Sequence, residues 1–211
     1  MITDLVPIKT ALLSVSDKTD LVAFARRLIN CCGTTIISTG GTARTLTEAG
    51  IDVTPIDQVT RFPEMMDGRV KTLHPKIHGG LLALRDKEDH AASLAEHQIT
   101  PIDLVCVNLY PFEKTIANPN VSDADAIEQI DIGGPSMVRS AAKNHQYVTI
   151  VTDPKQYDKV ANDIEHNEGK TALALRRSLA AAAFTRTSEY DTAISIWMKS
   201  RFAEYPANKE A

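Results

Sequence analysis

The sequence of 211 residues has few cysteines and no long apolar run. Cys31, Cys32 and Cys106 are odd in number and include an adjacent pair, so they predict no disulfide framework and are interpreted as small buried hydrophobic residues. No signal peptide and no stretch long enough to span a bilayer is found. We therefore expect a cytoplasmic protein without a membrane partner.

Positive charge is also in short supply. The formal net charge is −4 and the isoelectric point is about 5.9. A nucleic-acid-binding surface needs a concentrated positive field, so we expect no nucleic-acid partner. Any anion site must be local, made by a few lysines and arginines. Hydrophobic residues make up 43% of the chain, which is ample for a packed core.

Sequence motifs for common cofactors are missing too. Neither the Gly-x-x-x-x-Gly-Lys-[Ser/Thr] loop nor the G-x-G-x-x-G fingerprint occurs, so use of ATP or NAD is poorly supported. His74 and His78 are four residues apart, but Pro75 lies between them and no His-Glu-x-x-His motif is present. We therefore expect neither a metal nor a cofactor.

Short apolar runs alternate with amphipathic helical patterns along the chain. Helical patterns follow residue 17 and Pro154 and cover 42–49, 89–97 and 135–144, and strands are expected at 11–13, 34–37, 53–56, 104–107 and 148–151. This alternation predicts an α/β fold of three layers, with a mainly parallel central sheet and helices on both faces.

A long helical pattern over residues 171–202 predicts a C-terminal helical extension. It is longer than one sheet layer needs, so part of it is expected to pack against the partner subunit of a homodimer. Residues 1–203 are expected to form one domain, and residues 204–211 a linker or tail.

Three local features carry further expectations. Asp17 offers an N-cap to the helix that follows it. The periodicity disappears over residues 61–85, and a long irregular segment inside a compact domain is usually functional. Arg176 and Arg177 lie within a helical pattern and are interpreted as a solvated face.

Polar clusters follow three of the expected strands, at residues 14–18, 39–42 and 108–110. In an open parallel sheet, ligands bind outside the carboxyl ends of the strands, so these clusters are expected to meet. Gly40 and Gly41 allow the backbone to approach an anion closely, and the helix after them offers free N–H groups. Lys18 and Arg69 would supply charge to a phosphate.

Seven motifs in this order give the chain a family resemblance: S-V-S-D-K-T at 14–19, S-T-G-G-T at 38–42, F-P-E-M at 62–65, G-R-V-K-T-L-H-P at 68–75, C-V-N-L-Y-P-F at 106–112, Q-I-D-I-G-G at 129–134 and A-A-K-N-H at 141–145. From about Lys9 to about Phe202 the chain closely resembles the IMP cyclohydrolase domain of the bifunctional purine-biosynthesis protein. The resemblance implies the methylglyoxal-synthase-like α/β fold. The other domain of that protein, an AICAR transformylase, has no counterpart in these residues, so either a free-standing enzyme with a transformylase partner chain or a fragment is expected.

The resemblance implies a function and a set of site residues. The domain closes the ring of FAICAR to give IMP with loss of water, without metal or cofactor. The residues expected around the phosphate and ribose are Ser16, Asp17, Lys18, Thr39, Gly40, Gly41, Thr42, Arg69, Val70, Lys71 and Thr72. Those expected at the reacting base are Asn108, Leu109, Asp131, Ile132 and Gly133. The catalytic group is expected to be Lys71, Tyr110, Asp131 and Lys143.

The chemistry suits this catalytic group. Lys71 and backbone N–H groups near Gly133 would stabilise charge on the formyl oxygen, a kind of contact typically worth ~10²–10³ in rate. Asp131 would accept a proton from the carboxamide nitrogen, and Lys143 with Tyr110 would return one to the departing hydroxyl. A proton-shuttling lysine needs burial or cationic neighbours, and Lys71 and Arg69 would be such neighbours for Lys143 if all three converge on one pocket.

Two other functions remain open from the sequence. One is a lyase of the same fold that eliminates phosphate from a triose phosphate. It would leave the K-T-L-H-P and A-K-N-H blocks without a role. The other is a regulatory module that binds a nucleotide or a phosphate. That module would account for the Gly-Gly turn and Lys18, but not for Lys71, Lys143, Asp131 and Tyr110.

Overall fold

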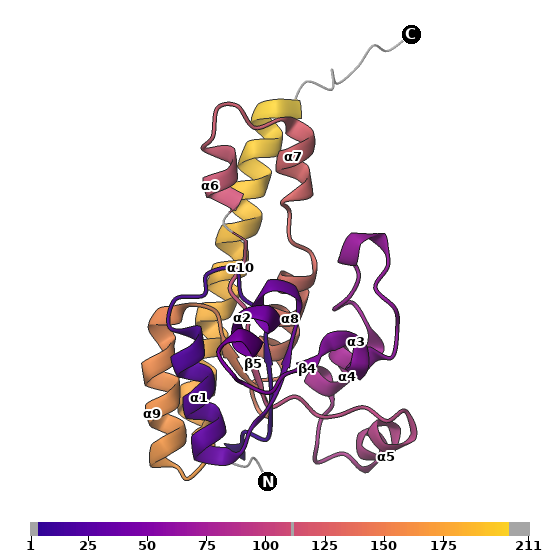
Figure 1. The fold of residues 1–211 in the computed structure, drawn as a ribbon, viewed down its shortest axis with the longest axis vertical. Coiled ribbons are helices and arrows are strands. Elements are labelled where there is room, and N and C mark those ends of the chain that lie inside the picture. Colours follow the sequence, from indigo (N-terminus) through magenta and orange to yellow (C-terminus); the bar gives the residue numbers. More distant parts are fainter. Residues whose placement is uncertain (1–3, 111, 203–211) are drawn as a thin grey trace.

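A five-stranded parallel sheet forms the centre of the computed structural model, which describes residues 4–110 and 112–202 (Figure 1). The strand order is β4-β3-β2-β5-β6, and each neighbouring pair is parallel. The strands of this sheet are β2 (Thr10–Leu13), β3 (Thr35–Ser38), β4 (Thr54–Pro55), β5 (Leu104–Cys106) and β6 (Thr149–Val151). The predicted α/β architecture is confirmed.

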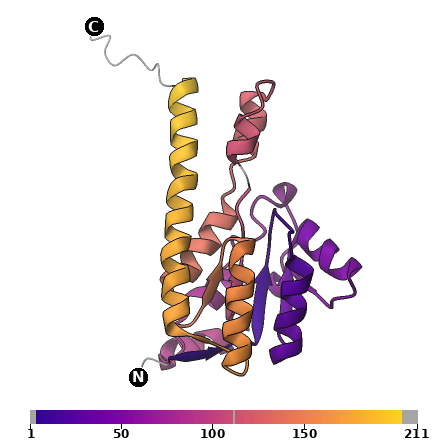
Figure 2. The same cartoon turned by 90° about the vertical axis from the view of Figure 1, so that its left-hand side faces the viewer.

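Helices cover both faces of the sheet: α8 and α10 pack together on one face, and α1 and α9 on the other (Figures 1 and 2). The helices are α1 (Leu21–Cys32), α2 (Gly40–Glu48), α3 (Ile56–Thr60), α4 (Pro75–Leu82), α5 (Glu88–Glu96), α6 (Phe112–Ile116), α7 (Asp123–Glu128), α8 (Gly133–Lys143), α9 (Tyr157–His166) and α10 (Leu173–Phe202), with short 3₁₀ turns at Met66–Gly68 and Pro154–Gln156. In the described part of the chain, no helix is long and apolar enough to cross a membrane.

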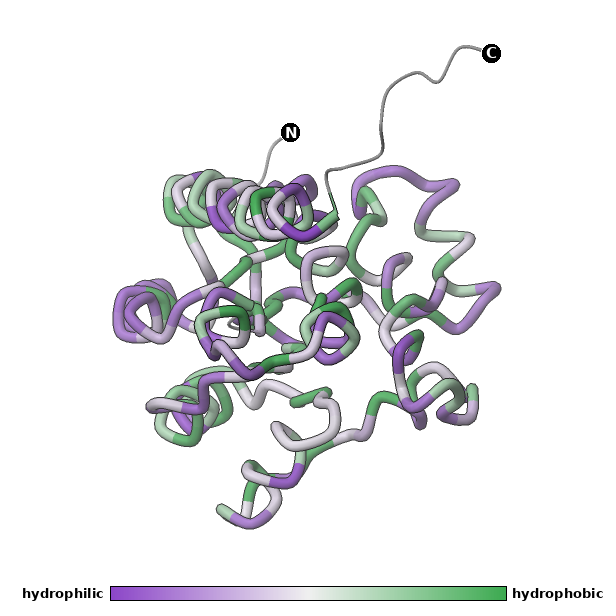
Figure 3. Tube along the Cα trace, turned by 90° about the horizontal axis from the view of Figure 1, so that it is seen from above, coloured by the Kyte–Doolittle hydropathy of each residue, from purple (hydrophilic) through white to green (hydrophobic). Residues whose placement is uncertain are grey.

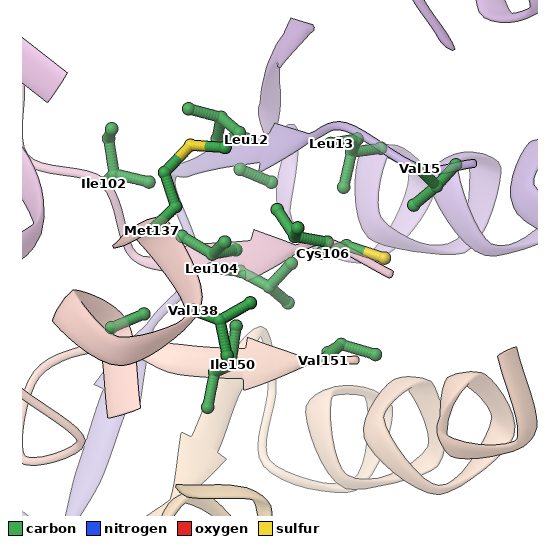
Figure 4. Close-up of a cluster of buried hydrophobic side chains, with 14 of the residues drawn as sticks. Leu12, Leu13, Val15, Ile102, Leu104, Cys106, Met137, Val138, Ile150 and Val151 are labelled. Carbon is green, nitrogen blue, oxygen red and sulfur yellow. The ribbon is translucent and has the colours of Figure 1, made fainter. Parts of the chain in front are cut away.

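The core lies between these layers. Leu12, Leu104 and Ile150 come from three adjacent strands, and Met137 and Val138 of α8 lie against them (Figure 4). Each fully buried aliphatic side chain contributes about 1.5–3 kcal/mol relative to an exposed one. Both faces of the sheet are covered, which explains why its strands are continuous apolar runs. The surrounding helices carry hydrophobic and hydrophilic residues on the same coil (Figure 3).

The upper half of α10 extends beyond the sheet and runs beside α6 and α7 (Figures 1 and 2). An aromatic cluster joins them: the ring of Phe112 on α6 lies edge-on to Trp197 at 5.6 Å and to Tyr190 at 6.3 Å. The predicted C-terminal helical extension is therefore present, and it is packed against the segment that links β5 to α8. The expected tail, 204–211, lies outside the described residues, and the single domain over 1–203 stays a prediction.

Several local expectations were wrong. Asp17 does not cap α1, because the helix begins at Leu21 after a left-handed Asp20. The Asp17 carboxylate instead accepts bonds from the backbone and hydroxyl of Thr19, at 2.9 and 2.7 Å. The irregular segment contains helix α4. Its start has ordinary signals, since His74 accepts a capping bond from Lys76 N at 3.1 Å and Pro75 occupies the first turn.

Two long-range features were also missed. Arg176 is fully buried rather than solvated, and it donates to the carbonyl oxygens of His145 at 2.9 Å and Gln146 at 3.2 Å. A second sheet pairs β1 (Leu5–Pro7) with β7 (Lys170–Ala172) in antiparallel fashion. Arg176 therefore holds the start of α10 against the turn before β6, below the sheet.

Candidate functional site

A cavity of about 480 Å³, here called the site cavity, opens where β2, β3 and β5 end. This volume lies within the usual range for small-molecule sites. The residues that line it follow these strands or precede α8, and they are Ser14, Val15, Ser16, Lys18, Thr39, Gly40, Gly41, Thr42, Asp67, Gly68, Arg69, Lys71, Thr72, Val107, Asn108, Tyr110, Glu128, Gln129, Ile130, Asp131, Ile132, Gly133, Gly134 and Met137. The polar clusters predicted to meet at this edge of the sheet do meet there.

One end of the site cavity is the N-terminus of α2. Its N-cap residue, Thr39, makes no side-chain capping bond, because its hydroxyl pairs with that of Ser14 at 2.7 Å. Gly40 has a positive φ of 44°, which glycine adopts without strain. An uncapped helix N-terminus with an accessible backbone binds anions through free N–H groups and the helix dipole.

Lys18 and Arg69 both line the site cavity, and Lys18 stands at this end. The side chain of Lys18 lies beside Gly41, where a Cβ on the glycine would be 3.9 Å from Lys18 Nζ. The guanidinium of Arg69 lies 3.5 Å from the carboxylate of Glu128, and both side chains are more than half exposed. An exposed pair of this kind contributes at most about 1 kcal/mol, so an anionic ligand can compete for Arg69.

Thr42 and Asn108 hold the walls of the site cavity rather than leaving their side chains free. The Thr42 hydroxyl accepts from Val15 N at 2.9 Å and donates to Val15 O at 3.0 Å. The Asn108 carboxamide accepts from Ser16 N at 2.6 Å and Asp17 N at 2.9 Å, and donates to Asp17 O at 2.9 Å. The sequence indicated contacts to the ligand and gave no sign of this loop-fixing role.

Asp131 stands at the other end, where α8 begins. Its Oδ1 accepts a bond from Gly134 N at 2.9 Å. Burial raises the pKa of Asp131 above its ordinary value, while the N–H groups of Gly134 and Gly133 and the positive charge of Lys71 act in the opposite direction. A carboxylate with a raised pKa near a cation is a suitable general base.

Gly133 and Gly134 are needed because other side chains lie too close to them to leave room for a Cβ atom. A Cβ on Gly133 would overlap the hydroxyl of Thr72, and a Cβ on Gly134 would overlap the carboxylate of Asp131. The same added atom on Gly134 would lie 3.2 Å from Leu109 Cδ2. The two glycines therefore let the 70–73 segment and the Asp131 side chain lie directly against the first turn of α8.

The Lys71 ammonium group lies close to two other glycines, Gly40 and Gly68. A Cβ on Gly40 would be 3.6 Å from Lys71 Nζ, and one on Gly68 would be 3.3 Å from it. The carboxyl carbon of Glu64 lies 3.3 Å from that second position. A smaller cavity of about 190 Å³ adjoins here; Lys71 lines both cavities, whereas Val70 lines only the smaller one.

Three other predicted residues lie outside the site cavity. Asp17 and Leu109 do not line it, and Leu109 is only 5% exposed. Lys143 is exposed at the far end of α8. With a rise of 1.5 Å per residue it is about 15 Å along the axis from Gly133. One copy of the chain therefore does not bring Lys143 to Lys71, Asp131 and Tyr110.

The sequence assigned no individual role to the remaining lining residues, which are Ser14, Val15, Asp67, Gly68, Val107, Glu128, Gln129, Ile130, Gly134 and Met137. Most of them lie inside one of the seven motifs, and Asp67 and Glu128 lie next to one, so membership of a motif was the available signal. Within residues 4–110 and 112–202, no group of three or more His, Cys, Asp or Glu side chains is arranged to hold a metal ion.

Known proteins match nearly the whole chain. Residues 20–136 match the MGS-like domain family, and residues 141–211 match the AICARFT/IMPCHase bienzyme family. The bifunctional purine biosynthesis protein PurH of Roseobacter denitrificans is 56% identical over 98% of this chain and 39% of its own length. The same protein of Streptococcus mutans is 55% identical over 95% of this chain and 39% of its own length.

The chain thus spans about two fifths of the length of the curated relatives that it matches. A solved structure described as the crystal structure of ForH superposes with a TM-score of 0.79 at 36% identity, covering 89% of this chain and 97% of that chain. These similarities confirm the resemblance drawn from the seven motifs. Because the first match covers more than half of the residues, the chain belongs to the MGS-like domain family.

Proposed function

We propose that the site cavity closes the ring of FAICAR to give IMP with loss of water. The observation that carries this proposal is that one cavity holds both an anion-binding helix N-terminus and a partly buried carboxylate. An open helix N-terminus with Lys18 suits a phosphate. The opposite end holds Asp131, with a raised pKa, and the charge of Lys71, whose Nζ lies beside Gly40, acts on Asp131. The matches to the AICARFT/IMPCHase bienzyme family and to PurH support it.

The phosphate end provides binding rather than chemistry. Lys18 and Arg69 are point and bidentate cations, and backbone N–H groups of α2 add directional donors. The net charge of the chain is −4, so these local cations define where an anion binds. A nucleotide held by its phosphate here would direct its base towards α8 and Asp131.

Cyclisation needs orientation and charge stabilisation. The reacting groups already belong to one molecule, so the substrate itself provides much of the entropic advantage of holding them close together. Asp131 takes the proton from the carboxamide nitrogen as that nitrogen bonds to the formyl carbon. Lys71 and the N–H groups at the start of α8 stabilise the negative charge on the former formyl oxygen. That oxygen leaves as water with two protons, the one that Asp131 took from the carboxamide nitrogen and one lost from the formamide nitrogen as the C=N bond forms. Tyr110, which lines the site cavity and is 53% exposed, passes a proton to the departing hydroxyl.

Lys143 takes part only if a second copy of the chain carries it to this cavity. That requirement ties its predicted catalytic role to the predicted homodimer. The cytoplasmic location and a transformylase domain or partner chain also stay predictions.

Purified protein mixed with FAICAR tests the proposal. We expect IMP to accumulate, which its absorbance reports. Binding of IMP without turnover would favour the regulatory module instead. Release of phosphate from a triose phosphate would favour the lyase. Formyl transfer from formyl-tetrahydrofolate to AICAR is not expected, because the chain spans only part of the bifunctional relatives.

A further inference from the structure

We propose that Tyr190 of α10 is a positioning residue for Asp131: its hydroxyl fixes the backbone from which the catalytic carboxylate projects. The inference rests on the proposed function, in which Asp131 accepts the carboxamide proton. It adds a residue from the C-terminal helix to a site otherwise built from the loops around the sheet.

The contact itself is direct and partly buried. Asp131 N donates to the Tyr190 hydroxyl at 2.8 Å, across 59 residues of sequence. Tyr190 is only 1% exposed. Asp131 lies in the short connection between α7 and α8, where its backbone is outside both helices. One bond from Tyr190 therefore fixes its backbone and one from Gly134 N fixes its carboxylate.

Tyr190 is in turn held firmly. Its ring lies edge-on to Phe112 at 6.3 Å, and the guanidinium of Arg186 lies over the ring at 6.0 Å. Arg186 also bonds to the carboxylate of Glu113 at 3.3 Å. A buried side chain held by these contacts has little freedom to follow a moving partner, so Tyr190 acts as a fixed reference point for Asp131.

The same ring supports the segment that carries Tyr110. Phe112 packs against Tyr190, and Phe112 N donates to Tyr110 O at 2.8 Å. Helix α10 thus braces two elements of the site cavity, one by a hydrogen bond and one by ring packing. Only the hydrogen bond to Asp131 depends on the Tyr190 hydroxyl, which separates the two roles experimentally.

The bond has a physical reason to persist. A buried N–H without a partner is unfavourable, and so is a buried hydroxyl. Burial raises the pKa of Tyr190, so the hydroxyl stays neutral across the working range; the charged groups facing it are Asp131, Glu113 and Arg186. Phenylalanine in place of Tyr190 would keep the packing and leave Asp131 N unpaired, which should let the connection before α8 shift.

The test is Tyr190→Phe in the whole chain, measured by steady-state conversion of FAICAR to IMP. A displacement of about 1 Å at a catalytic group can reduce rate 10²-fold, so we expect kcat to fall about 10- to 100-fold with KM changed less than about threefold. The matched control is Tyr147→Phe, which removes another hydroxyl of a largely buried tyrosine; this hydroxyl accepts from Gln146 Nε2 at 3.2 Å, also bonds to Asp86, and lies outside the site cavity. This control should keep the wild-type kcat.

A double-mutant comparison isolates the route through Asp131. In an Asp131→Asn background, Tyr190→Phe should lower the residual kcat by less than about twofold, because the group it positions is already disabled. An equal loss in both backgrounds, or a wild-type kcat in Tyr190→Phe alone, would overturn the proposal. Thermal melts of all variants identify any loss that comes from unfolding.

Hydrogen exchange gives a readout that does not require turnover. Tyr190→Phe should speed exchange of the Asp131 amide, and Tyr147→Phe should not. Unchanged exchange at Asp131 would refute the positioning contact. Absence of IMP formation by the wild-type chain would instead reject the proposed function, so the two failures are distinguishable.

Discussion

Replacing Gly134 by alanine tests whether activity depends on the position of the Asp131 carboxylate. The added Cβ would lie 2.9 Å from Asp131 Cγ and 3.2 Å from Leu109 Cδ2. Ordinary carbon contacts lie near ~3.5 Å, so the carboxylate must move by about 0.6 Å or more. Such a shift would disrupt the 2.9 Å bond that Asp131 Oδ1 accepts from Gly134 N.

The effects on stability and on rate should differ in size. Loss of a hydrogen bond to a charged group costs about 1.5–3 kcal/mol. Alanine in place of helical glycine offsets about 1 kcal/mol of this loss through propensity. The net destabilisation of Gly134→Ala should therefore be about 0.5–2 kcal/mol. The rate should fall much further in proportion, by about 10²-fold in kcat, because the base no longer points at its proton.

Steady-state conversion of FAICAR to IMP and a thermal melt measure both effects. Gly79→Ala is a suitable control. It also adds a methyl to a helix, α4, at 3.0 Å from the flexible end of Ile99, and Gly79 lines neither cavity. The control should keep the wild-type kcat. A folded Gly134→Ala with kcat within about threefold of wild type would refute the reasoning, since its carboxylate cannot remain in place.

Three further predictions concern the charged residues. Lys18→Ala should raise KM about tenfold or more with little change in kcat, whereas Lys71→Met should lower kcat about 10²–10³-fold. Similar changes in KM and kcat for both variants would contradict the assignment of Lys18 to binding and Lys71 to chemistry. Burial raises the pKa of Asp131 above its ordinary 3.8, so the folded state is penalised at high pH, and the penalty is relieved as pH falls through the raised pKa towards 3.8. Asp131→Asn should therefore raise the melting temperature at pH 7 more than at pH 4, and an equal or opposite shift would oppose this. If the partner subunit of a homodimer supplies Lys143 to the site, an equal mixture of inactive Lys143→Met and Asp131→Asn chains should recover about a quarter of wild-type activity. The reason is that half of the dimers are mixed and each mixed dimer has one intact site out of two. Failure of the two inactive variants to complement each other would exclude a shared site.

Much of the sheet was predictable because the sequence states it locally. Leu12, Leu104 and Ile150 lie in short apolar runs bounded by turn residues, and the structure buries all three. The position of the site cavity followed from a general property of parallel sheets, whose ligands bind at the carboxyl ends of the strands. The polar clusters therefore had to meet, even though their spacing in the sequence is irregular.

The features that were missed depend on contacts between distant residues. Arg176 looks like any surface arginine until the carbonyls of His145 and Gln146 are placed around it. The strands β1 and β7 are each three residues long and lie far apart in the sequence, so no local pattern indicates their pairing. The bond between Asp131 and Tyr190 is equally remote in sequence.

Lys143 shows the limit of transferring a motif by order alone. It follows Asp131 by one helix, and a helix separates its two ends in space. Sequence order therefore placed the two residues in one catalytic group, while the fold puts them at opposite ends of α8. The motif remains a guide to the family, and the geometry decides which residues one copy of the chain can bring together.

The most direct measurement is the rate of IMP formation by the purified chain with FAICAR as the only reactant and a metal chelator present. We predict many turnovers for the wild-type chain, and a kcat about 10²–10³-fold lower for Lys71→Met with IMP binding retained. A folded wild-type chain that binds IMP and forms none from FAICAR would contradict the proposed ring closure.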